Sequence, residues 1–326
     1  MSAYLPTEPG VASIGLALLA ATLGLGFAIT RFGSRPRARV AAWALVAAAV
    51  VGAERLTAGQ PPGFRMLGLV GVLLYAMKAV VCVEGGASRE SGLGWARWWG
   101  FAIAWPGMRP DPFATAGRRR VPGGPALMAR GLGWLVAGAA LVLLARAVWR
   151  SGGSLALATA LVLPGLSLIL HFGIFNLLAG AWRLAGVNVG PLFRAPVRSR
   201  SLTEFWGRRW NLAFSEMTAI GIYRPLAPRL GRPAATAVAF IGSGLLHELA
   251  ISVPVKAGFG LPSLYFALQG ALMLIERALE RAGSPVHRTA WIGRLWTLAW
   301  LVLPLPILFH RPFLAGVVWP LLGPGR

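Results

Sequence analysis

Apolar runs close to the length of a membrane-spanning helix recur along almost the whole 326-residue chain. They lie at about 11–30, 40–52, 66–83, 131–149, 155–182, 233–253, 261–279 and 290–309. Because a helix needs about 20 apolar residues to cross the hydrocarbon of a bilayer, these runs predict about eight transmembrane helices, give or take one or two. The chain is 56% hydrophobic and 13% charged, with a mean hydropathy of +0.64, and no hydrophilic stretch is long enough for a separate soluble core. We therefore expect an all-α polytopic membrane protein, with residues 1–326 forming a single membrane domain.

Basic residues gather on alternate connecting segments of this pattern. The segments 31–39, 84–128, 183–232 and 280–289 together contain 21 of the 32 basic residues, whereas the opposite loops and the C-terminal tail contain six. Short loops rich in Arg and Lys stay on the cytoplasmic side of a membrane. The distribution therefore predicts a cell-membrane protein whose Arg-rich segments are cytoplasmic and, with eight spans, whose two termini both lie outside.

The net charge of +22 has two interpretations. An excess of Arg, Ala, Gly and Pro can reflect a GC-rich genome alone. Alternatively, the charge holds the protein against anionic lipid headgroups and attracts phosphate-bearing substrates. Nucleic acid is not favoured as a partner, because the arginines alternate with the spans and form no continuous face; the sequence does not specify an oligomeric state.

Two of the cytoplasmic segments contain more than a connector needs. Segment 92–113 has four tryptophans beside arginines and is too short for a clear span, which predicts an interfacial or re-entrant helix. Segment 183–232 is long and mixes arginines with aromatic residues. A loop of that length in a compact protein is usually functional or disordered, and its aromatic content argues against disorder.

One histidine lies inside an otherwise apolar run. His247, followed by Glu248, interrupts the run 234–253, in which Gly242 and Gly244 leave room for the close approach of another helix or a substrate. An ionisable side chain in hydrocarbon is costly and is by default a functional-site hypothesis. From the residues alone, His247 is either hydrogen-bonded between helices, with Glu248 capped by an arginine, or a general base near neutral pH. Both interpretations require a polar pocket within the membrane.

Metal chemistry is not favoured by the sequence. Cys82 is the only cysteine, and the four histidines lie far apart along the chain. Ile251 stands where a zinc-protease helix beginning at His247 would need its second histidine. We therefore expect no metal site and no cofactor.

A block of aromatic and basic side chains precedes this histidine in the Arg-rich segment 183–232. Arg208 and Arg209 offer forked donors suited to phosphate or carboxylate. Trp206 and Trp210 are amphipathic surfaces that favour the membrane interface. These four residues are candidates for substrate binding.

Asn211 follows this block at the expected start of a helix from Leu212 to Tyr223. Asparagine is strongly preferred as the N-cap of a helix, which is the structural interpretation. The functional interpretation is that its amide orients His247 or donates a hydrogen bond to oxyanion charge, as preorganised amides do in acyl transfer.

The order of these motifs resembles the membrane-bound O-acyltransferase superfamily and, within it, the wax synthase-like branch. The paired signature is Ser-Leu-Thr-Glu-Phe-Trp-Gly-Arg-Arg-Trp-Asn at 201–211 followed by Ser-Gly-Leu-Leu-His-Glu at 243–248. Two further landmarks are similar, Ala-Trp-Pro-Gly-Met at 104–108 and Leu-Ala-Gly-Val-Asn at 184–188. The resemblance covers about residues 90–248 and implies a multi-helix fold around a catalytic cavity.

The resemblance also implies a chemistry. An acyl group would pass from acyl-CoA, as co-substrate, to the hydroxyl of a lipophilic alcohol, forming a wax-type ester. His247 matches the proposed base and Asn211 the signature asparagine, with Trp206, Arg208, Arg209, Trp210 and Glu248 as substrate-binding residues. Neither Ser243 nor Cys82 is obviously paired with a base, which agrees with direct attack of the alcohol on the thioester.

Two other functions remain open from the sequence. A transporter or channel could use His247 and Glu248 as a proton or ion relay, although the spans lack a second set of buried acids and a visible inverted repeat. The same fold could also acylate a sterol, terpenol, glycerolipid or sugar instead of a long-chain alcohol.

The remaining polar groups in or near the spans are expected to be structural. Lys78 is predicted to extend its ammonium toward the membrane interface. Glu276 and Glu280, one turn apart with arginines beside them, predict a solvated helix end. His287 and His310 are expected at the interface.

Overall fold

The computed structural model describes residues 2–32, 34–85, 93–283 and 288–324, and the regular elements within these ranges are helices. The chain divides into two compact units, Met1–Leu192 with Leu314–Arg326 and Phe193–Phe313, called here the first and the second unit. The prediction of an all-α polytopic membrane protein is confirmed. His287 falls outside the described residues.

Seven helical segments in the described part of the chain are long and apolar enough to cross a membrane. They are Pro9–Ile29, Arg35–Thr57, Pro62–Gly85, Gly124–Arg150, Leu155–Leu184, Arg232–Val255 and Ala290–Leu308. The run predicted at 261–279 does form a helix, α14 (Leu261–Arg281), but it includes Gln269, Glu276 and Arg277 and is not apolar enough to join them. The number of spans is therefore one below the predicted eight and within the stated error.

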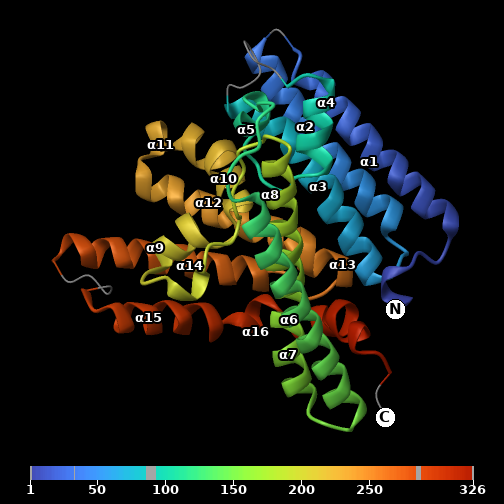
Figure 1. The fold of residues 1–326 in the computed structure, drawn as a ribbon, viewed down its shortest axis with the longest axis vertical. Helices are drawn as coiled ribbons and strands as arrows, with labels where there is room; N and C mark the ends of the chain where they lie inside the picture. Colours follow the sequence, from blue (N-terminus) through green and yellow to red (C-terminus); the bar gives the residue numbers. More distant parts are fainter. Residues whose placement is uncertain (1, 33, 86–92, 284–287, 325–326) are drawn as a thin grey trace. The chain divides into compact units, whose positions relative to one another are not determined.

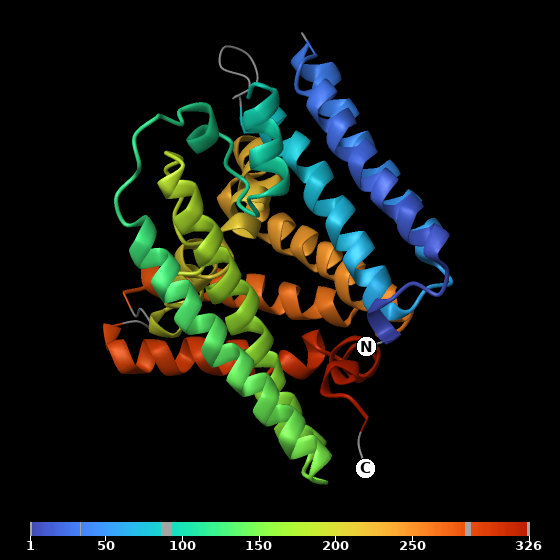
Figure 2. The same cartoon turned by 45° about the vertical axis from the view of Figure 1, so that its right-hand side comes forward.

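Three of these helices pack together in the first unit. They are α1 (Pro9–Ile29), α2 (Arg35–Thr57) and α3 (Pro62–Gly85). Figures 1 and 2 show them side by side in blue. Their sequences are rich in Ala, Leu and Val, and α3 is the most buried of the seven spans.

A second group in the first unit is an antiparallel pair of long helices (Figure 2). One is α6 (Gly124–Arg150); the other runs from α7 (Leu155–Ser167) through a π-helical turn (Leu168–Ile174) into α8 (Phe175–Leu184). Glycines at seven-residue spacing on α6 meet the partner helix: Gly124, Gly131 and Gly138. A Cβ atom at these positions would lie 3.0, 2.9 and 2.7 Å from the carbonyl oxygens of Gly180, Gly173 and Gly165. The two helices therefore approach backbone to backbone, as small residues permit in membrane proteins.

Short helices follow the first three spans, in the segment predicted to be interfacial. They are α4 (Trp95–Ile103) and α5 (Asp111–Ala114), both too short to cross a membrane. Lys78 of α3 is completely buried beneath this segment, and its Nζ donates to the carbonyl oxygens of Phe101, Trp105 and Gly107 at 3.1, 2.7 and 2.6 Å. The prediction that Lys78 reaches the interface is wrong, because the backbone around the Trp-Pro-Gly landmark satisfies all three ammonium protons.

The last residues of the chain return to the first unit. A π-helical turn (Leu314–Val318) and a 3₁₀ turn (Trp319–Leu322) form this segment. Tyr4 Oη donates to Val317 O at 2.6 Å, and Arg146 Nε donates to Leu321 O at 2.8 Å. These bonds join the two ends of the chain to the same unit.

The second unit contains the signature segments and begins with short helices. In order they are a 3₁₀ turn (Pro196–Arg198), α9 (Leu202–Glu204), a π-turn (Phe205–Arg209), α10 (Leu212–Thr218), a second π-turn (Ala219–Tyr223) and α11 (Arg224–Leu230). Longer helices follow: α12 (Arg232–His247), a π-turn (Glu248–Ser252), α13 (Val253–Val255), α14, α15 (Ala290–Val302), α16 (Leu305–Leu308) and α17 (Arg311–Phe313). The helix predicted over Leu212–Tyr223 is confirmed.

The core of the second unit lies where α14 meets α15, α9 and the π-turn Phe205–Arg209. Figure 1 shows α14 and α15 side by side, in orange and red. Gln269 Nε2 donates to Trp300 O at 2.8 Å across this contact, and Tyr265 Oη donates to Leu301 O at 3.2 Å. The buried cluster between the helices consists of Leu202, Phe205, Leu272, Met273 and Leu301.

Candidate active site

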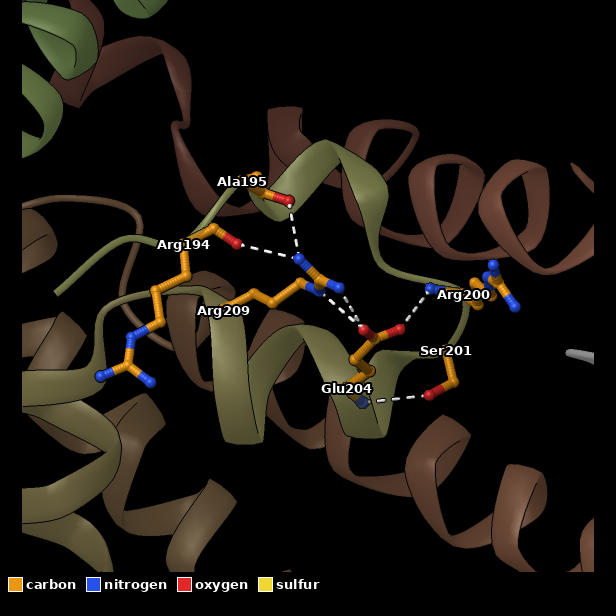
Figure 3. Close-up of polar contacts among 6 residues, drawn as sticks. All are labelled: Arg194, Ala195, Arg200, Ser201, Glu204 and Arg209. Carbon is orange, nitrogen blue, oxygen red and sulfur yellow. Dashed lines mark hydrogen bonds and ion pairs between the residues drawn. The ribbon is translucent and has the colours of Figure 1, made fainter. Parts of the chain in front are cut away.

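The first signature segment folds into a capped helical turn with its own ion pair (Figure 3). Ser201 is the N-cap and its Oγ accepts from Glu204 N at 3.0 Å, while Glu204 Oε2 accepts from Arg200 N at 2.8 Å. Arg209 Nε and Nη2 contact Glu204 Oε1 at 2.7 and 2.6 Å, and Arg209 Nη1 donates to Arg194 O at 3.1 Å. Burial raises the pKa of Glu204, but the hydrogen bond from Arg200 N and the Arg209 guanidinium outweigh it and hold the pKa below its usual value.

Glu276 of α14 anchors the start of this helical turn. Its Oε1 accepts from Leu202 N and from Trp296 Nε1 at 2.8 and 2.9 Å, and its Oε2 accepts from Thr203 N at 3.1 Å. The residue is only 6% exposed. The prediction that Glu276 belongs to a solvated helix end is therefore wrong, because backbone N–H groups at the start of α9 satisfy the carboxylate inside the unit. Glu280 is exposed, as predicted.

The two signature arginines have different surroundings. Arg209 is committed to Glu204 and to backbone carbonyls, so it stabilises the segment. Arg208 is exposed and lines a polar cavity of about 300 Å³. The cavity is lined by Arg200, Ser201, Thr203, Glu204, Arg208, Glu276 and Glu280.

The two signature tryptophans also differ. Trp210 is stacked on Phe205 with ring centroids 5.4 Å apart and packs edge-on against Phe193 at 4.9 Å. Trp206 donates from Nε1 to Gln269 Oε1 at 3.2 Å and lines a second, mostly apolar cavity of about 370 Å³. Trp206 therefore borders a space large enough for part of a substrate, whereas Trp210 is not among the residues that line it.

Asn211 caps the helix that starts immediately after it. It has the left-handed φ of 40°, which asparagine tolerates better than most residues, and its Oδ1 accepts from Phe214 N at 3.2 Å. The N-cap interpretation is confirmed. Within the described residues no hydrogen bond joins Asn211 to His247, but the two share a neighbour: the Phe214 ring lies 5.1 Å from the imidazole.

His247 is the last residue of α12, where the helix widens into a π-turn. Its Nδ1 lies 2.7 Å from Ser243 O. A carbonyl oxygen can only accept a hydrogen bond, so Nδ1 has the proton and Nε2 presents its lone pair. Since no hydrogen bond to Nε2 is found in the described part of the chain, this nitrogen is available to accept a proton from a bound molecule.

The imidazole lies beside the apolar cavity. Phe266 of α14 packs against the imidazole in a tilted arrangement, with ring centroids 4.0 Å apart. The ring of Phe214 also contacts the imidazole, with centroids 5.1 Å apart. Both phenylalanines line the cavity, and so does Ser243, whose carbonyl holds Nδ1. The full lining is Trp206, Gly207, Phe214, Ser215, Thr218, Ala219, Tyr223, Thr236, Ala239, Phe240, Ser243, Phe266, Met273 and Arg277.

Glu248 lines neither cavity and binds the start of α14. Its Oε1 accepts from Gly260 N, Ser263 N and Ser263 Oγ at 2.9, 3.0 and 2.9 Å. In one of the two interpretations an arginine capped this carboxylate; the N–H groups at a helix N-terminus bind one of its oxygens instead. Gly244, one turn earlier, faces the same place, since a Cβ there would lie 2.8 Å from Ser263 Cα. The close helix approach predicted at Gly244 is confirmed.

A second histidine of the unit is buried rather than interfacial. His310 is 4% exposed, and its Nδ1 accepts from Phe313 N at 3.3 Å. Nε2 therefore has the proton and donates to Ser252 Oγ at 3.4 Å, while Ser252 Oγ itself donates to Gly258 O. This polarity is opposite to that of an activated serine nucleophile. Burial lowers the pKa of His310, against the attraction of Glu248.

The geometry thus brings together part of the predicted set. Trp206 and Phe214 line the apolar cavity, and Arg208 lines the polar one. His247 contacts the ring of Phe214, and Asn211 caps the backbone N–H of the same residue. Sequence reasoning missed Phe266, since an aromatic residue in an apolar run is the ordinary composition of such a helix. In the described residues, no group of three His, Cys, Asp or Glu side chains is placed to hold a metal ion.

Comparison with known proteins finds a family whose model matches these residues. Residues 189–268, which include both halves of the paired signature, match the model of the membrane bound O-acyl transferase family. Over this segment the chain is similar to that family. A probable long-chain-alcohol O-fatty-acyltransferase 9 of Arabidopsis thaliana is 32% identical over 143 residues, which are 40% of this chain and 41% of the relative.

Two further relatives are similar over shorter stretches. A long-chain-alcohol O-fatty-acyltransferase of Simmondsia chinensis is 33% identical over 111 residues, 30% of this chain and 31% of the relative. An acyl-CoA–sterol O-acyltransferase 1 of Arabidopsis thaliana is 33% identical over 73 residues, 20% of this chain and 21% of the relative. The predicted resemblance to the wax synthase-like branch is confirmed, and the chain matches at most about two fifths of the length of these relatives.

Proposed function

We propose that the chain is an O-acyltransferase of the wax synthase type, which transfers an acyl group from acyl-CoA to the hydroxyl of a lipophilic alcohol. The observation that supports this most is the tautomer of His247. Its Nδ1 proton is held by Ser243 O, which leaves the Nε2 lone pair free, and the ring contacts Phe214 and Phe266, which line the apolar cavity. The names of the relatives, which are alcohol or sterol acyltransferases, support the same reaction class.

In the proposed reaction His247 is the general base. Its Nε2 takes the proton of the alcohol as the oxygen attacks the thioester carbonyl carbon. A carbon–oxygen bond forms, the carbon–sulfur bond breaks, and the imidazolium returns its proton to the departing CoA thiolate. The hydrogen bond from Nδ1 to Ser243 O stays in place throughout and stabilises the charged ring.

The other predicted site residues have distinct proposed roles. Asn211 is a positioning residue, because its cap on Phe214 N holds that ring against the imidazole. Trp206 forms part of the substrate cavity, and exposed Arg208 contacts a phosphate of CoA. Arg209, Trp210 and Glu248 act indirectly, by holding the signature turn and the start of α14.

The proposed entry routes follow the charge distribution. The Arg-rich segment 183–232 faces the cytoplasm, where acyl-CoA is soluble, and anionic headgroups hold it at the membrane. The alcohol, which partitions into lipid, arrives from the bilayer. No resident cofactor is needed for this reaction.

The proposal is tested by incubating membranes that contain the protein with labelled acyl-CoA and a panel of alcohols, and identifying esters by mass spectrometry. The His247→Ala variant is expected to lose about 10² to 10⁴ of the rate, the usual contribution of a general base. His171→Ala is the matched control, because His171 is also in an apolar helix and lines neither cavity, and its Nδ1 lies 3.0 Å from Ser167 Oγ, four residues earlier. Full activity of His247→Ala, or no ester from the wild type, would contradict the proposal.

The acceptor is the less defined half of the reaction. A sterol is the second candidate, since one relative is named as an acyl-CoA–sterol O-acyltransferase. Including cholesterol and a plant sterol beside C12 to C18 alcohols in the same panel separates the two. A sterol ester formed faster than any linear ester would replace the wax-type assignment without changing the role of His247.

A further inference from the structure

The apolar cavity beside His247 has a guanidinium at one end. Arg277 of α14 lines it and donates from Nη1 to Thr236 Oγ1 of α12 at 3.1 Å. The other lining residues are aromatic, aliphatic or hydroxyl-bearing, and none is acidic. A cation in such a space attracts an anionic ligand group more strongly than one in water does.

The serine and threonine hydroxyl groups in this cavity are already engaged. Ser215, Thr218, Thr236 and Ser243 each donate to a backbone carbonyl oxygen within hydrogen-bond distance. A guanidinium has five N–H donors, and in the described residues the side chain of Arg277 makes one hydrogen bond, to Thr236. Arg277 therefore retains donors for a bound anion.

The polar cavity has a lining of mixed charge. Two arginines line it, Arg200 and Arg208, but three carboxylates line it as well, those of Glu204, Glu276 and Glu280. Glu276 and Glu280 lie beside Arg277 in the sequence but border that other cavity. The lining charge is thus about −1 in the polar cavity and +1 in the apolar one.

Arg277 lines the cavity, whereas His247 contacts two of its lining residues, Phe214 and Phe266. The partner of Arg277, Thr236, is in the second turn of α12, and His247 is its last residue. Eleven residues separate them, which is roughly 16 Å at 1.5 Å per residue of α-helix. Ser243 and Phe266 continue the lining toward His247. The start of α12 also follows directly on the Arg-rich segment 183–232.

We propose that Arg277 is an anion subsite that binds a phosphate of the acyl donor while the thioester lies near His247. The inference rests on the proposed function and deepens it by assigning a donor-binding residue. The forked guanidinium suits a phosphate, which it can contact through two parallel N–H donors. The apolar walls between the two residues then take the uncharged linker of the donor.

The test compares a donor that has phosphates with one that lacks them. Acyl-CoA and the corresponding acyl-pantetheine share the thioester, and only the first is anionic. For Arg277→Ala we expect KM for acyl-CoA to rise roughly 10- to 100-fold, as for loss of a charge-assisted hydrogen bond, with KM for acyl-pantetheine changed less than about twofold. Arg277→Lys should be intermediate, because it keeps the charge and loses the fork.

Arg281→Ala is the matched control. Arg281 is one turn farther along α14, donates to Arg277 O at 3.2 Å and lines neither cavity. Its KM for acyl-CoA should stay near that of the wild type. An equal rise of KM for both donors in Arg277→Ala, or an unchanged KM for acyl-CoA, would overturn the subsite.

A binding measurement separates this inference from the proposed reaction. Calorimetry with free CoA and with pantetheine, in neutral micelles, requires no turnover. Arg277→Ala should weaken CoA binding and leave pantetheine unaffected; CoA affinity that is independent of Arg277 would refute the subsite even if esters form. Repeating the kinetics in vesicles with and without phosphatidylglycerol tests a lipid headgroup as the ligand. An Arg277 effect confined to the anionic vesicles and equal for both donors would also overturn the assignment to the acyl donor.

Discussion

The imidazole of His247 stacks on the ring of Phe266, with centroids 4.0 Å apart and planes inclined by 33°. This contact restrains the ring torsion that directs Nε2. Replacing Phe266 with Leu keeps apolar bulk but removes the aromatic face, which is worth about 0.5–1.5 kcal/mol. We expect kcat for acyl transfer to fall up to about tenfold. Phe240→Leu is the control, because Phe240 lines the same cavity but contacts Trp206. Equal kcat in the two variants would contradict a role for the stack.

Replacing the buried carboxylate of Glu276 should strongly lower the free energy of unfolding. Glu276→Ala leaves the N–H groups of Leu202 and Thr203 and the indole of Trp296 without an acceptor. Each unsatisfied buried donor costs about 1–3 kcal/mol, so we expect the free energy of unfolding to fall by at least about 2 kcal/mol. The matched control is Glu280→Ala, one turn away and exposed, which should change it little. Thermal unfolding of detergent-extracted protein measures both, and similar shifts would argue against the anchor.

Lys78 should be indispensable for folding of the first unit. Lys78→Met keeps the length of the side chain but leaves the carbonyls of Phe101, Trp105 and Gly107 without their donor. We expect a loss of at least about 3 kcal/mol in the free energy of unfolding, from about 1 kcal/mol or more per buried group. Lys256→Met, at the other lysine of the chain and on the surface, serves as control. A melting temperature of Lys78→Met equal to that of the control would show that the carbonyls find other donors.

Substitution by alanine should change stability differently at two glycines of α6 that are two residues apart. A Cβ at Gly131 would lie 2.9 Å from Gly173 O and 3.0 Å from Leu177 N, both backbone atoms that cannot rotate away. Gly131→Ala should therefore destabilise by about 1–3 kcal/mol. At Gly133 a Cβ meets nothing within 4 Å, so Gly133→Ala should be neutral or stabilise by up to about 1 kcal/mol. Melting curves of the two variants test the sign, and a fall in both would mean that α6 is sensitive to any change.

Local patterns were read correctly from the sequence because their causes lie within a few residues. Asn211 caps the helix that starts at Leu212, since asparagine satisfies the free N–H groups of a first turn. The close approach at Gly244 followed from the absence of a side chain. The apolar runs also predicted the spans, because a span depends on the composition of one continuous segment. The exception is α14, which has polar residues at one end and on buried faces and is not among the seven spans.

Long-range polar partners were not predictable. Lys78 finds its acceptors 23 to 29 residues later, and Glu276 finds its backbone donors more than 70 residues earlier. The sequence shows each of these charges only beside its own helical neighbours, where an interface or a solvated end is the ordinary expectation. The same holds for the candidate site. His247 was predictable because it is an ionisable residue in an apolar run. Phe266 and Arg277 were not, because their contacts with α12 arise only when α14 packs against it.

The carboxylate of Glu248 has a mechanical consequence for the residue before it. Three donors at the first turn of α14 converge on one oxygen of this side chain, and Phe266 is in that same first part of α14. The end of α12 and the start of α14 therefore shift as one body. If the second unit widens when a substrate enters, the hinge must lie outside this joint. His247 Nε2 would then keep its direction while other parts of the cavity lining move.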